Sequence, residues 1–575
     1  MNARTWAATA GRYARGPVGI ALSMAVLLGA LEVWGNQGPG YFAGWGDHFV
    51  LSPEGLSWAI PGAFANDWFM ETSPQPHWFF DIVTWAGQAS GHLSTAYTLF
   101  WAVGLLAFGA ATALMAGLVA RRAAWPVAVG FTFLISQTPW EIGGTGSLVI
   151  AQALPAVTSA SLIYLALAAL LANRRWLAAV AAVLVAIVHV QEGAVIAIVL
   201  VAFTVVDVIR ARRVDWRLVG AIGVTLAFVV FGLALRPVAS NLTDFVAICD
   251  AVIPYHCAAH LWNRHELASA IGLIVLTGLS CFLLPRRARV AWLVTVGLAT
   301  LGYTLGFAAD ALSVPVLGQL AQAVNVYRLG VVLLPFAIWG ALLPVLKPEW
   351  SVWGFVRLVA WWLALAGLLA SPFNRIPATF TPAFLAIAGT IAVCALLAFR
   401  FRGRLSRPFL VGLSSFLLGL LFVFTAAGTG ALTFRTPDFR FISSQTLVQW
   451  GEEVRAAVPA GAVIVSSPRD EWTKLVTQRA VVADCKDVPY GGAPWREWKR
   501  RIGQLGGLEQ CQTGVLLYNE LSAGRLIGLA DEFHSDFITL NPSLSETAEG
   551  LKARGWHLLV QPVGTSGVLL FGRSA

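Results

Sequence analysis

The sequence predicts an α-helical polytopic membrane bundle of about thirteen spans, followed by a small C-terminal α/β extracytoplasmic domain. The chain has 575 residues, of which 57% are hydrophobic and only 12% are charged, and its mean hydropathy is +0.70. Soluble domains usually carry about 25% charged residues. Long apolar runs alternate with short basic clusters, and the composition changes after Thr429. These observations favour a membrane bundle with one added domain.

Seven basic clusters fix the expected topology, because Lys and Arg in short loops mark the cytoplasmic side. They are Arg4/Arg12/Arg15, Arg121/Arg122, Arg174/Arg175, Arg210/Arg212/Arg213/Arg217, Arg286/Arg287/Arg289, Lys347/Arg357 and Arg400/Arg402/Arg404/Arg407. The spans expected between them are 17–34, 94–119, 123–137, 156–173, 176–190, 193–210, 218–236, 267–284, 290–308, 329–346, 354–370, 381–398 and 409–428. An odd number places the N-terminus in the cytoplasm and the C-terminus outside it.

The first span is expected to be an uncleaved signal anchor, because its apolar run exceeds the 7–15 residues usual in a signal peptide. The formal net charge of +9 arises from Arg at the cytoplasmic boundary, so nucleic-acid binding is disfavoured. The Arg- and Ala-rich composition favours a bacterial inner membrane protein.

Two regions are expected. Residues 1–428 form the transmembrane helical domain, and its long first outer loop, 35–93, is rich in Trp, Phe, Pro and Gly. Such a loop favours short helices at the lipid–water boundary. Residues 429–575 form the α/β domain. Its expected strands are 462–467, 480–484, 514–519, 556–561 and 567–571, with helices near 495–505 and 544–554.

The first outer loop holds Asp47, Asp67, Asp81, His48 and His77. An outer-facing Asp could act as general base for a hydroxyl nucleophile, or the carboxylates could hold a divalent cation. His77 could contact a phosphate. The alternative is that these groups cap short helices, as Asp67 would after Asn66. Asp47, in GWGDHF, is the first choice for the base.

Polar groups also interrupt the bundle near its outer side. The run 176–210 is too long for one span and should turn back at HVQEG, which places His189 and Glu192 near the outer surface. Arg328, after Tyr327, begins an apolar run, and Arg binds phosphate bidentately. Snorkelling is the alternative explanation for Arg328. Arg264 and His265 occupy a similar position.

The α/β domain contributes a third set of candidates. The stretch with Asp484, Lys486, Trp495 and Trp498 could line an acceptor cleft, or it could be a solvated helix face. Four of the six cysteines fall in outer segments as Cys249/Cys257 and Cys485/Cys511, and an oxidising compartment would permit two disulfides. The Cys281 and Cys394 side chains are expected to be packing residues.

The absence of two common catalytic motifs reduces the number of reaction classes to consider. The sequence has no Walker A pattern and no GxSxG elbow. The cytoplasmic loops are too short to bind a nucleotide sugar. A donor must therefore be used from the outer side, where a lipid-phosphate carrier is the expected energised form.

The layout resembles the GT-C superfamily of polyprenyl-phosphate-sugar-dependent integral membrane glycosyltransferases. The shared features are one N-terminal span, a long acidic first outer loop, a multi-span bundle and an outer C-terminal domain. The resemblance implies transfer of a sugar from a polyprenyl-phosphate donor to an extracytoplasmic glycan or glycolipid acceptor. It also implies Asp47, with Asp67 as substitute, as base and Arg328 as donor-phosphate ligand. The first loop lacks an adjacent acid pair and an Asp-x-Asp, and no Trp-Trp-Asp motif is present, which disfavours protein N-glycosylation.

Two other functions stay open at this point. A transporter or flippase of a lipid-linked saccharide would use His189, Glu192 and Arg328 as a pathway, although the halves show no repeat symmetry. A non-catalytic scaffold for envelope assembly would rely on the C-terminal domain.

Overall fold

The computed structural model divides the chain into two compact units, each described by itself. It describes residues 16–35, 41–73, 77–120, 124–136, 151–235, 242–262, 264–281, 284, 286–312, 314, 326–346 and 436–573. The helical unit comprises Met1–Tyr41, Phe100–Phe231 and Pro254–Pro437. The mixed unit comprises Phe42–Leu99, Gly232–Ile253 and Asp438–Ala575.

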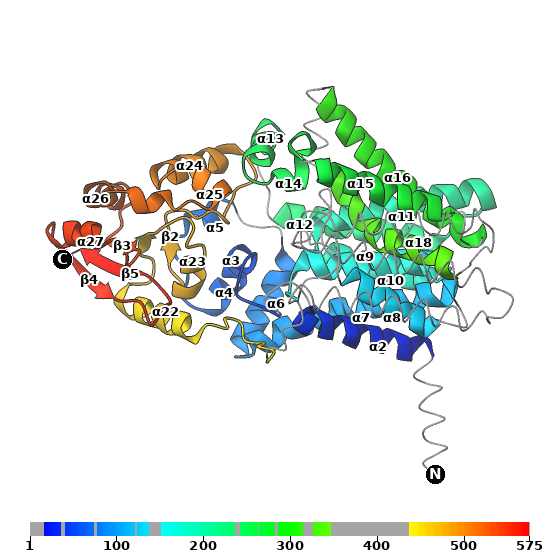
Figure 1. Cartoon of the computed structure of the whole chain (residues 1–575), viewed down its shortest axis with the longest axis horizontal. Helices are drawn as coiled ribbons and strands as arrows, with labels where there is room; N and C mark the ends of the chain where they lie inside the picture. The colour runs from blue at the N-terminus through cyan, green and yellow to red at the C-terminus, as the bar shows by residue number, and fades with distance from the viewer. Residues whose placement is uncertain are drawn as a thin grey trace, which may run out of the picture. The chain divides into compact units, whose positions relative to one another are not determined.

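Apolar helices dominate the helical unit (Figure 1). The long ones are α2 (Pro17–Ala30), α7 (Leu93–Val119), α8 (Ala124–Ile135), α9 (Pro155–Leu171), α10 (Arg175–Val188), α11 (Val190–Ala211), α12 (Trp216–Leu235), α15 (Arg264–Ser280), α16 (Arg286–Ala311) and α18 (Leu334–Leu346). A π-helical turn, η1 (Leu31–Gly35), extends α2. Two short helices, α14 (Pro254–Cys257) and η2 (Ala259–Leu261), precede α15, and a 3₁₀ helix, η4 (Val326–Val332), precedes α18.

Five helices in the described part of the chain are long and apolar enough to cross a membrane. These are Pro17–Trp34, Leu93–Val119, Val190–Ala211, Trp216–Leu235 and Ala288–Ala309. Two shorter apolar helices, Pro155–Leu171 and Arg175–Val188, correspond to further expected spans. The chain is therefore an integral membrane protein. The expected spans 354–370, 381–398 and 409–428 lie outside the described residues, so the total of about thirteen stays a prediction.

The expected turn within 176–210 is confirmed. Helix α10 ends at Val188, α11 begins at Val190, and His189 between them has extended backbone with φ −148°. The two helices pack against each other beyond the turn. A Cβ on Gly193 would lie 2.7 Å from Ala186 Cα, so the small residue permits this close packing. The chain therefore reverses inside an apolar run, and the polar residues of the turn lie at one end of the helix pair.

The mixed unit is built from three segments distant in the sequence. The first outer loop contributes α3 (His48–Leu51), α4 (Pro53–Ala59), α5 (Trp68–Thr72) and α6 (Trp78–Ala89), which confirms the expected short helices. The segment before Pro254 contributes α13 (Leu242–Ala251). The C-terminal segment contributes α22 (Gln445–Ala457), α23 (Trp472–Thr477), α24 (Gly492–Gln504), α25 (Glu509–Thr513), η6 (Leu517–Glu520), α26 (Ala523–Glu532) and α27 (Ser545–Lys552).

A five-stranded mixed sheet forms the centre of this unit. Its strands are β1 (Val463–Val465), β2 (Ala480–Val481), β3 (Phe537–Leu540), β4 (Trp556–Val560) and β5 (Leu569–Arg573), in the order β2-β1-β3-β5-β4. Strand β1 pairs in parallel with β2 and β3, and β5 pairs antiparallel with β3 and β4. The sheet confirms the expected α/β class.

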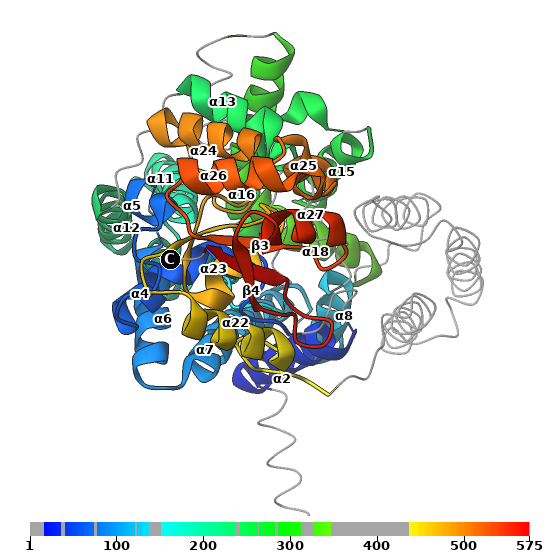
Figure 2. The same ribbon diagram turned by 90° about the vertical axis from the view of Figure 1, so that its left-hand side faces the viewer.

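Two hydrophobic cores cover the two faces of the sheet, because alternate residues of a strand point to opposite sides. In β1, Ile464 joins the core of α22 and α23, whereas Val465 joins the core of α24, α26 and α27. In β5, Leu570 and Phe571 divide in the same way. Figures 1 and 2 show α22 on one side of the strands and α24 with α26 on the other.

One predicted strand is wrong, and one strand of the sheet was not predicted. The segment 514–519 is not a strand, because it enters the 3₁₀ helix η6, in which Tyr518 is buried and donates to Thr539 O. Strand β3 was not expected, although its inner residues Ile538 and Leu540 are fully buried. Its sequence FITL is short, does not alternate between apolar and polar residues and follows a polar stretch, so local periodicity gives a weak signal.

A substitution at Gly567 would test how tightly the core around α22 is packed. Its φ is +87°, and an added Cβ would lie 2.4 Å from Cγ of the buried Trp450. Gly555 has a similar φ of +83° but open space around its Cβ position. We expect Gly555→Ala to cost about 1–2 kcal/mol through backbone strain alone. Gly567→Ala should cost about 1–3 kcal/mol more through overpacking.

The measurement is thermal unfolding of the full chain in detergent for both variants. Equal losses for the two substitutions would contradict the packing of Trp450 against Gly567.

Candidate functional site

The turn between α10 and α11 gathers polar groups inside the helical unit. The side chain of His189 caps α11, because its Nδ1 accepts a hydrogen bond from Glu192 N at 3.3 Å. Ser159 Oγ on α9 donates to Glu192 Oε2. The cap satisfies an amide that the helix start would otherwise leave without a partner. The carboxylate of Glu192 is thereby fixed at the first turn of α11.

Arg328 contacts this carboxylate from η4. Its Nη1 lies 3.7 Å from Glu192 Oε1, and the two side chains are 17% and 1% exposed. Arg328 Nε is buried and has no hydrogen-bond partner among the described residues. Ionisable groups among apolar helices are costly and generally functional. We name Ser159, His189, Glu192 and Arg328 the Arg328 cluster; within it the guanidinium retains donor capacity for an anion.

Tyr327 lies in an aromatic core next to this cluster. Its ring centroid is 4.8 Å from that of Trp262 and 5.5 Å from that of Tyr303, and the side chain is fully buried. It therefore anchors η4, the element that carries Arg328. Arg264 and His265 begin α15, and their side chains lie outside the described residues.

Asp47 lies at the start of α3 in the mixed unit. Its Oδ1 is 2.7 Å from Lys486 Nζ, and its side chain is 55% exposed, against 35% for Lys486. The backbone carbonyl of Asp47 accepts hydrogen bonds from Val50 N and Leu51 N. Asp47 is therefore a largely exposed carboxylate on a fixed backbone, and it forms an ion pair with Lys486.

The other first-loop candidates are packed within the unit. His48 is fully buried, its Nδ1 accepts from Gly44 N at 2.8 Å, and its ring packs on Phe80 and Tyr97. Asp81 is buried on α6, and the half-buried His77 precedes that helix. These positions suit a structural role in holding α3, α4 and α6 together.

Asp67 caps α5 and lies beside a buried lysine. Its Oδ1 accepts from Met70 N at 3.0 Å and lies 3.9 Å from Lys474 Nζ. The Lys474 ammonium donates to Asp487 and also lies over the Phe69 ring at 5.2 Å. Both Asp67 and Lys474 are almost fully buried. Asp67 thus connects the first outer loop to α23.

Two further carboxyls complete this buried group, which we name the Lys474 cluster: Asp67, Lys474, Asp484 and Asp487. Burial raises the pKa of Asp484 and Asp487, and the Lys474 ammonium opposes the rise. Asp484 Oδ1 accepts hydrogen bonds from the backbone amides of Lys486 at 2.9 Å and Asp487 at 2.8 Å. Burial alone would lower the pKa of Lys474, but the surrounding carboxylates raise it above its ordinary value. The cluster therefore holds a charged lysine in the protein interior.

Sequence reasoning missed Lys474 and Glu471. Lys474 lies within WTKLVT, where a lone cation among apolar residues was a usable signal for a buried ion pair. Burial, reinforced by the Asp484 carboxylate, raises the pKa of Glu471 to about 7. Lys486, Arg469 and Asp47 also act electrostatically on Glu471. This places Glu471 in the same charged neighbourhood as the Asp47–Lys486 pair.

Trp495 and Trp498 do not line a binding cleft. Both are buried in the core of α24, and their rings stack with centroids 5.2 Å apart. Trp498 Nε1 donates to Asp484 O at 2.9 Å. The alternation of aromatic and basic residues in this stretch reflects one buried and one exposed helix face.

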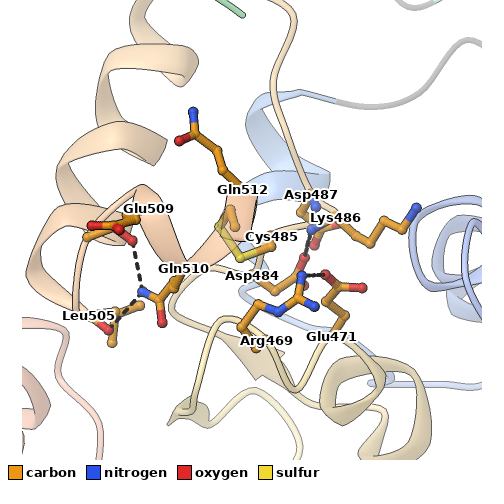
Figure 3. Close-up of a disulfide and its surroundings, with 12 residues drawn as sticks. Arg469, Glu471, Asp484, Cys485, Lys486, Asp487, Leu505, Glu509, Gln510 and Gln512 are labelled. Atoms are coloured by element: carbon orange, nitrogen blue, oxygen red, sulfur yellow. Dashed lines mark hydrogen bonds and ion pairs between the residues drawn. A yellow bond between two sulfur atoms is a disulfide. The ribbon is translucent and has the colours of Figure 1, made fainter. Parts of the chain in front are cut away.

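Cys485 and Cys511, for which the sequence permits a disulfide, are bonded to each other, and Figure 3 shows the bond between Asp484 and Lys486 on one side and α25 on the other. Cys249 and Cys257 are also disulfide-bonded. Cys281 is free and buried, as expected, and Cys394 lies outside the described residues. Within the described ranges, no group of three or more His, Cys, Asp or Glu residues is arranged to hold a metal ion.

Comparisons with known proteins give one family match and several structural likenesses. Residues 443–505 match a family described as a domain of unknown function, DUF6798. No curated protein matches the sequence. Over nearly its whole length the chain is structurally similar to ArnT and to an archaeal oligosaccharyltransferase, both GT-C membrane glycosyltransferases.

The ArnT structure, from Cupriavidus metallidurans and bound to undecaprenyl phosphate, has 14% identity and a TM-score of 0.46, covering 97% of this chain and 98% of ArnT. The apo oligosaccharyltransferase of Archaeoglobus fulgidus has 14% identity and a TM-score of 0.42, covering 91% and 69%.

Glu471 predicts a pH dependence of stability. Its carboxyl has a pKa near 4.5 when unperturbed and about 7 in the folded chain, so the folded state binds a proton that the unfolded state releases. Stability from this group is fully present below pH 4.5 and is lost as pH rises through 7. The loss is at most about 3 kcal/mol. Asp470, with a pKa raised by burial to about 6, acts in the same direction.

We expect the unfolding temperature of the full chain in detergent to fall between pH 5 and pH 8, and Glu471→Gln to reduce this fall. The matched control is Glu497→Gln. Hydrogen bonds from Arg500 lower the pKa of Glu497 to about 2, so this residue stays ionised throughout the range. An unchanged slope in Glu471→Gln would contradict the assignment.

Proposed function

We propose that this protein is a membrane glycosyltransferase that moves a sugar from a polyprenyl-phosphate donor to an extracytoplasmic acceptor. The observation that carries the proposal is the Arg328 cluster. A guanidinium among apolar helices, held by one carboxylate and with Nε unsatisfied, is suited to an anion on an apolar molecule. A lipid phosphate combines both properties.

Glu192 and His189 are proposed to prepare Arg328 for this anion. Glu192 holds Arg328 by charge, and Ser159 with the His189 cap fixes the position of Glu192. An arginine that is held in place loses less conformational freedom when it binds, so more of the interaction energy is available for affinity. The remaining donor groups of the guanidinium are proposed to contact the phosphate oxygens.

Asp47 is proposed as the general base. It accepts the proton of the acceptor hydroxyl while that oxygen forms a bond to the anomeric carbon of the sugar. The bond between the anomeric carbon and the phosphate oxygen breaks, and its electron pair leaves with the polyprenyl phosphate. The phosphate is a good leaving group and needs no added acid. Asp47 fits the role because its carboxylate is accessible and attached to a fixed backbone.

Asp67 is the weaker choice for the base. Its carboxylate caps α5 and faces the Lys474 ammonium, and both side chains are buried. A carboxylate that is 2% exposed and accepts a backbone amide is a poor proton acceptor for an incoming hydroxyl, whereas the Asp47 side chain is 55% exposed. We therefore propose that Asp67 holds the loop on the C-terminal segment, and that Asp47 performs the proton transfer.

The proposed orientation follows from the basic clusters, which place the N-terminus in the cytoplasm and both the first loop and the C-terminal segment outside it. In a bacterial inner membrane this would put the acceptor, a glycan or glycolipid, in the cell envelope. Donors on that side are lipid-linked, because nucleotide sugars are made and kept in the cytoplasm.

The first test is sugar transfer by the full chain in lipid, with a panel of polyprenyl-phosphate sugars and with or without EDTA. Asp47→Asn should lower the rate by about 10²–10⁴, the usual contribution of a general base. The transfer rate of Glu54→Gln, which alters another carboxylate of the same loop, should stay within a few fold of wild type. Full activity of Asp47→Asn would contradict the assignment. Movement of donor between leaflets without turnover would favour the flippase.

Arg328 makes a separate prediction about donor affinity. We expect Arg328→Gln to raise KM for the donor by about 10- to 100-fold, the loss of one charge-assisted interaction with phosphate. The matched control is Arg217→Gln, which removes an exposed arginine of the helical unit that pairs with Asp215 at 2.8 Å. Titration with polyprenyl phosphate measures the same affinity without turnover. Unchanged binding in Arg328→Gln would rule out Arg328 as the phosphate ligand.

A further inference from the structure

We infer that Lys486 is the positioning residue of the proposed base, and that the Cys485–Cys511 disulfide holds Lys486 in place to do so. The inference rests on the proposed function, because it assigns Lys486 a role toward Asp47. Lys486 comes from a segment more than 400 residues away in the sequence, and its Nζ lies 2.7 Å from Asp47 Oδ1.

The backbone of Lys486 is fixed by several contacts. Cys485 is bonded to Cys511 of α25, and Cys485 N donates to Pro468 O at 2.9 Å. Lys486 N donates to Asp484 Oδ1 at 2.9 Å, and Asp487 N donates to the same oxygen at 2.8 Å. Figure 3 shows the Lys486 side chain extending away from the disulfide. A residue held on both sides can direct a long side chain to one place.

The surroundings explain why the ammonium matters. The charged groups that act on this region are Asp47 at α3, Arg469 and Glu471 before α23, and Asp484 beside the disulfide. Arg469 Nη1 lies 3.5 Å from Glu471 Oε1, so that guanidinium is directed at the neighbouring carboxyl. Without Lys486, Asp47 would lose this ammonium at 2.7 Å, while the Glu471 carboxyl would still act on it electrostatically. Proton uptake by Asp47 would then become easier.

A purely structural salt bridge would behave differently. Lys486 and Asp47 are both partly exposed, and such pairs add little to folding stability. Lys552 forms a comparable exposed pair with Glu549 at 2.8 Å on α27, so Lys552→Gln is the matched control. A stability measurement cannot separate the two interpretations, whereas the pH dependence of the rate can.

The experiment is the pH profile of kcat/KM for sugar transfer by the full chain in lipid. In Lys486→Gln we expect the acidic limb to move up by about one pH unit, so that rates measured on that limb fall about tenfold. Lys486→Arg should restore most of the profile, because the positive charge returns. Salt should shift the limb in the wild type and leave it in place in Lys486→Gln, since the exposed pair is screened.

The disulfide is tested by Cys485→Ser combined with Cys511→Ser. We expect a shift of the limb in the same direction as in Lys486→Gln, because Lys486 loses its fixed backbone. A profile unchanged in Lys486→Gln would overturn the role of Lys486, and a profile unchanged in the double variant would overturn the role of the disulfide. A shift of equal size in Lys552→Gln would also overturn the inference.

Asp47→Asn separates this inference from the proposed function. If Asp47→Asn is inactive and Lys486→Gln keeps the wild-type profile, only the positioning role fails. If Asp47→Asn keeps full activity, the base assignment fails, and the positioning role fails with it. The unfolding temperature of each variant shows that the chain is folded when the rates are compared.

Discussion

The burial of Lys474 among three carboxyl groups is the interaction on which the mixed unit depends. Its ammonium meets Asp67 from the first outer loop and Asp487 from the segment after β2. Asp484, in the same cluster, accepts the backbone amides of Lys486 and Asp487. Removal of one partner would leave an uncompensated buried charge, which is strongly destabilising. The first outer loop and the segment after β2 therefore depend on each other for folding. The position of Lys486, and through it the contact with Asp47, depends on this cluster together with the Cys485–Cys511 disulfide.

The helical unit is subject to a related constraint. A helix break inside an apolar run leaves polar groups that have no water to satisfy them. The His189 cap satisfies one amide, Ser159 and Arg328 satisfy Glu192, and the aromatic core around Tyr327 holds the element that carries Arg328. Arg328 in the helical unit and Asp47 in the mixed unit are the charged groups to which we assign roles in the proposed reaction.

Local sequence patterns predicted the helix break in the membrane region and the α/β class of the C-terminal segment. The apolar run that was too long for one span predicted the turn at His189, and the cysteine context permitted a Cys485–Cys511 disulfide without fixing the pairing. Contacts between distant segments were not predictable, because a local sequence pattern does not determine which loops come into contact in the folded chain. Asp67 and Lys474 lie about 400 residues apart in the chain, and Asp47 and Lys486 are equally remote. Trp495 and Trp498 were ambiguous for the same reason, since a buried and a sugar-binding tryptophan have the same sequence signal.

The measurement that tests the central claim most directly is the anomeric configuration of the product. It would be determined by NMR on the glycan formed from a polyprenyl-phosphate sugar of known configuration. Direct attack by the acceptor oxygen, with Asp47 removing only a proton, inverts the anomeric carbon. The account predicts an inverted product. A retained configuration would mean that a protein side chain bonds to the sugar first, and would contradict the role of Asp47 as a base.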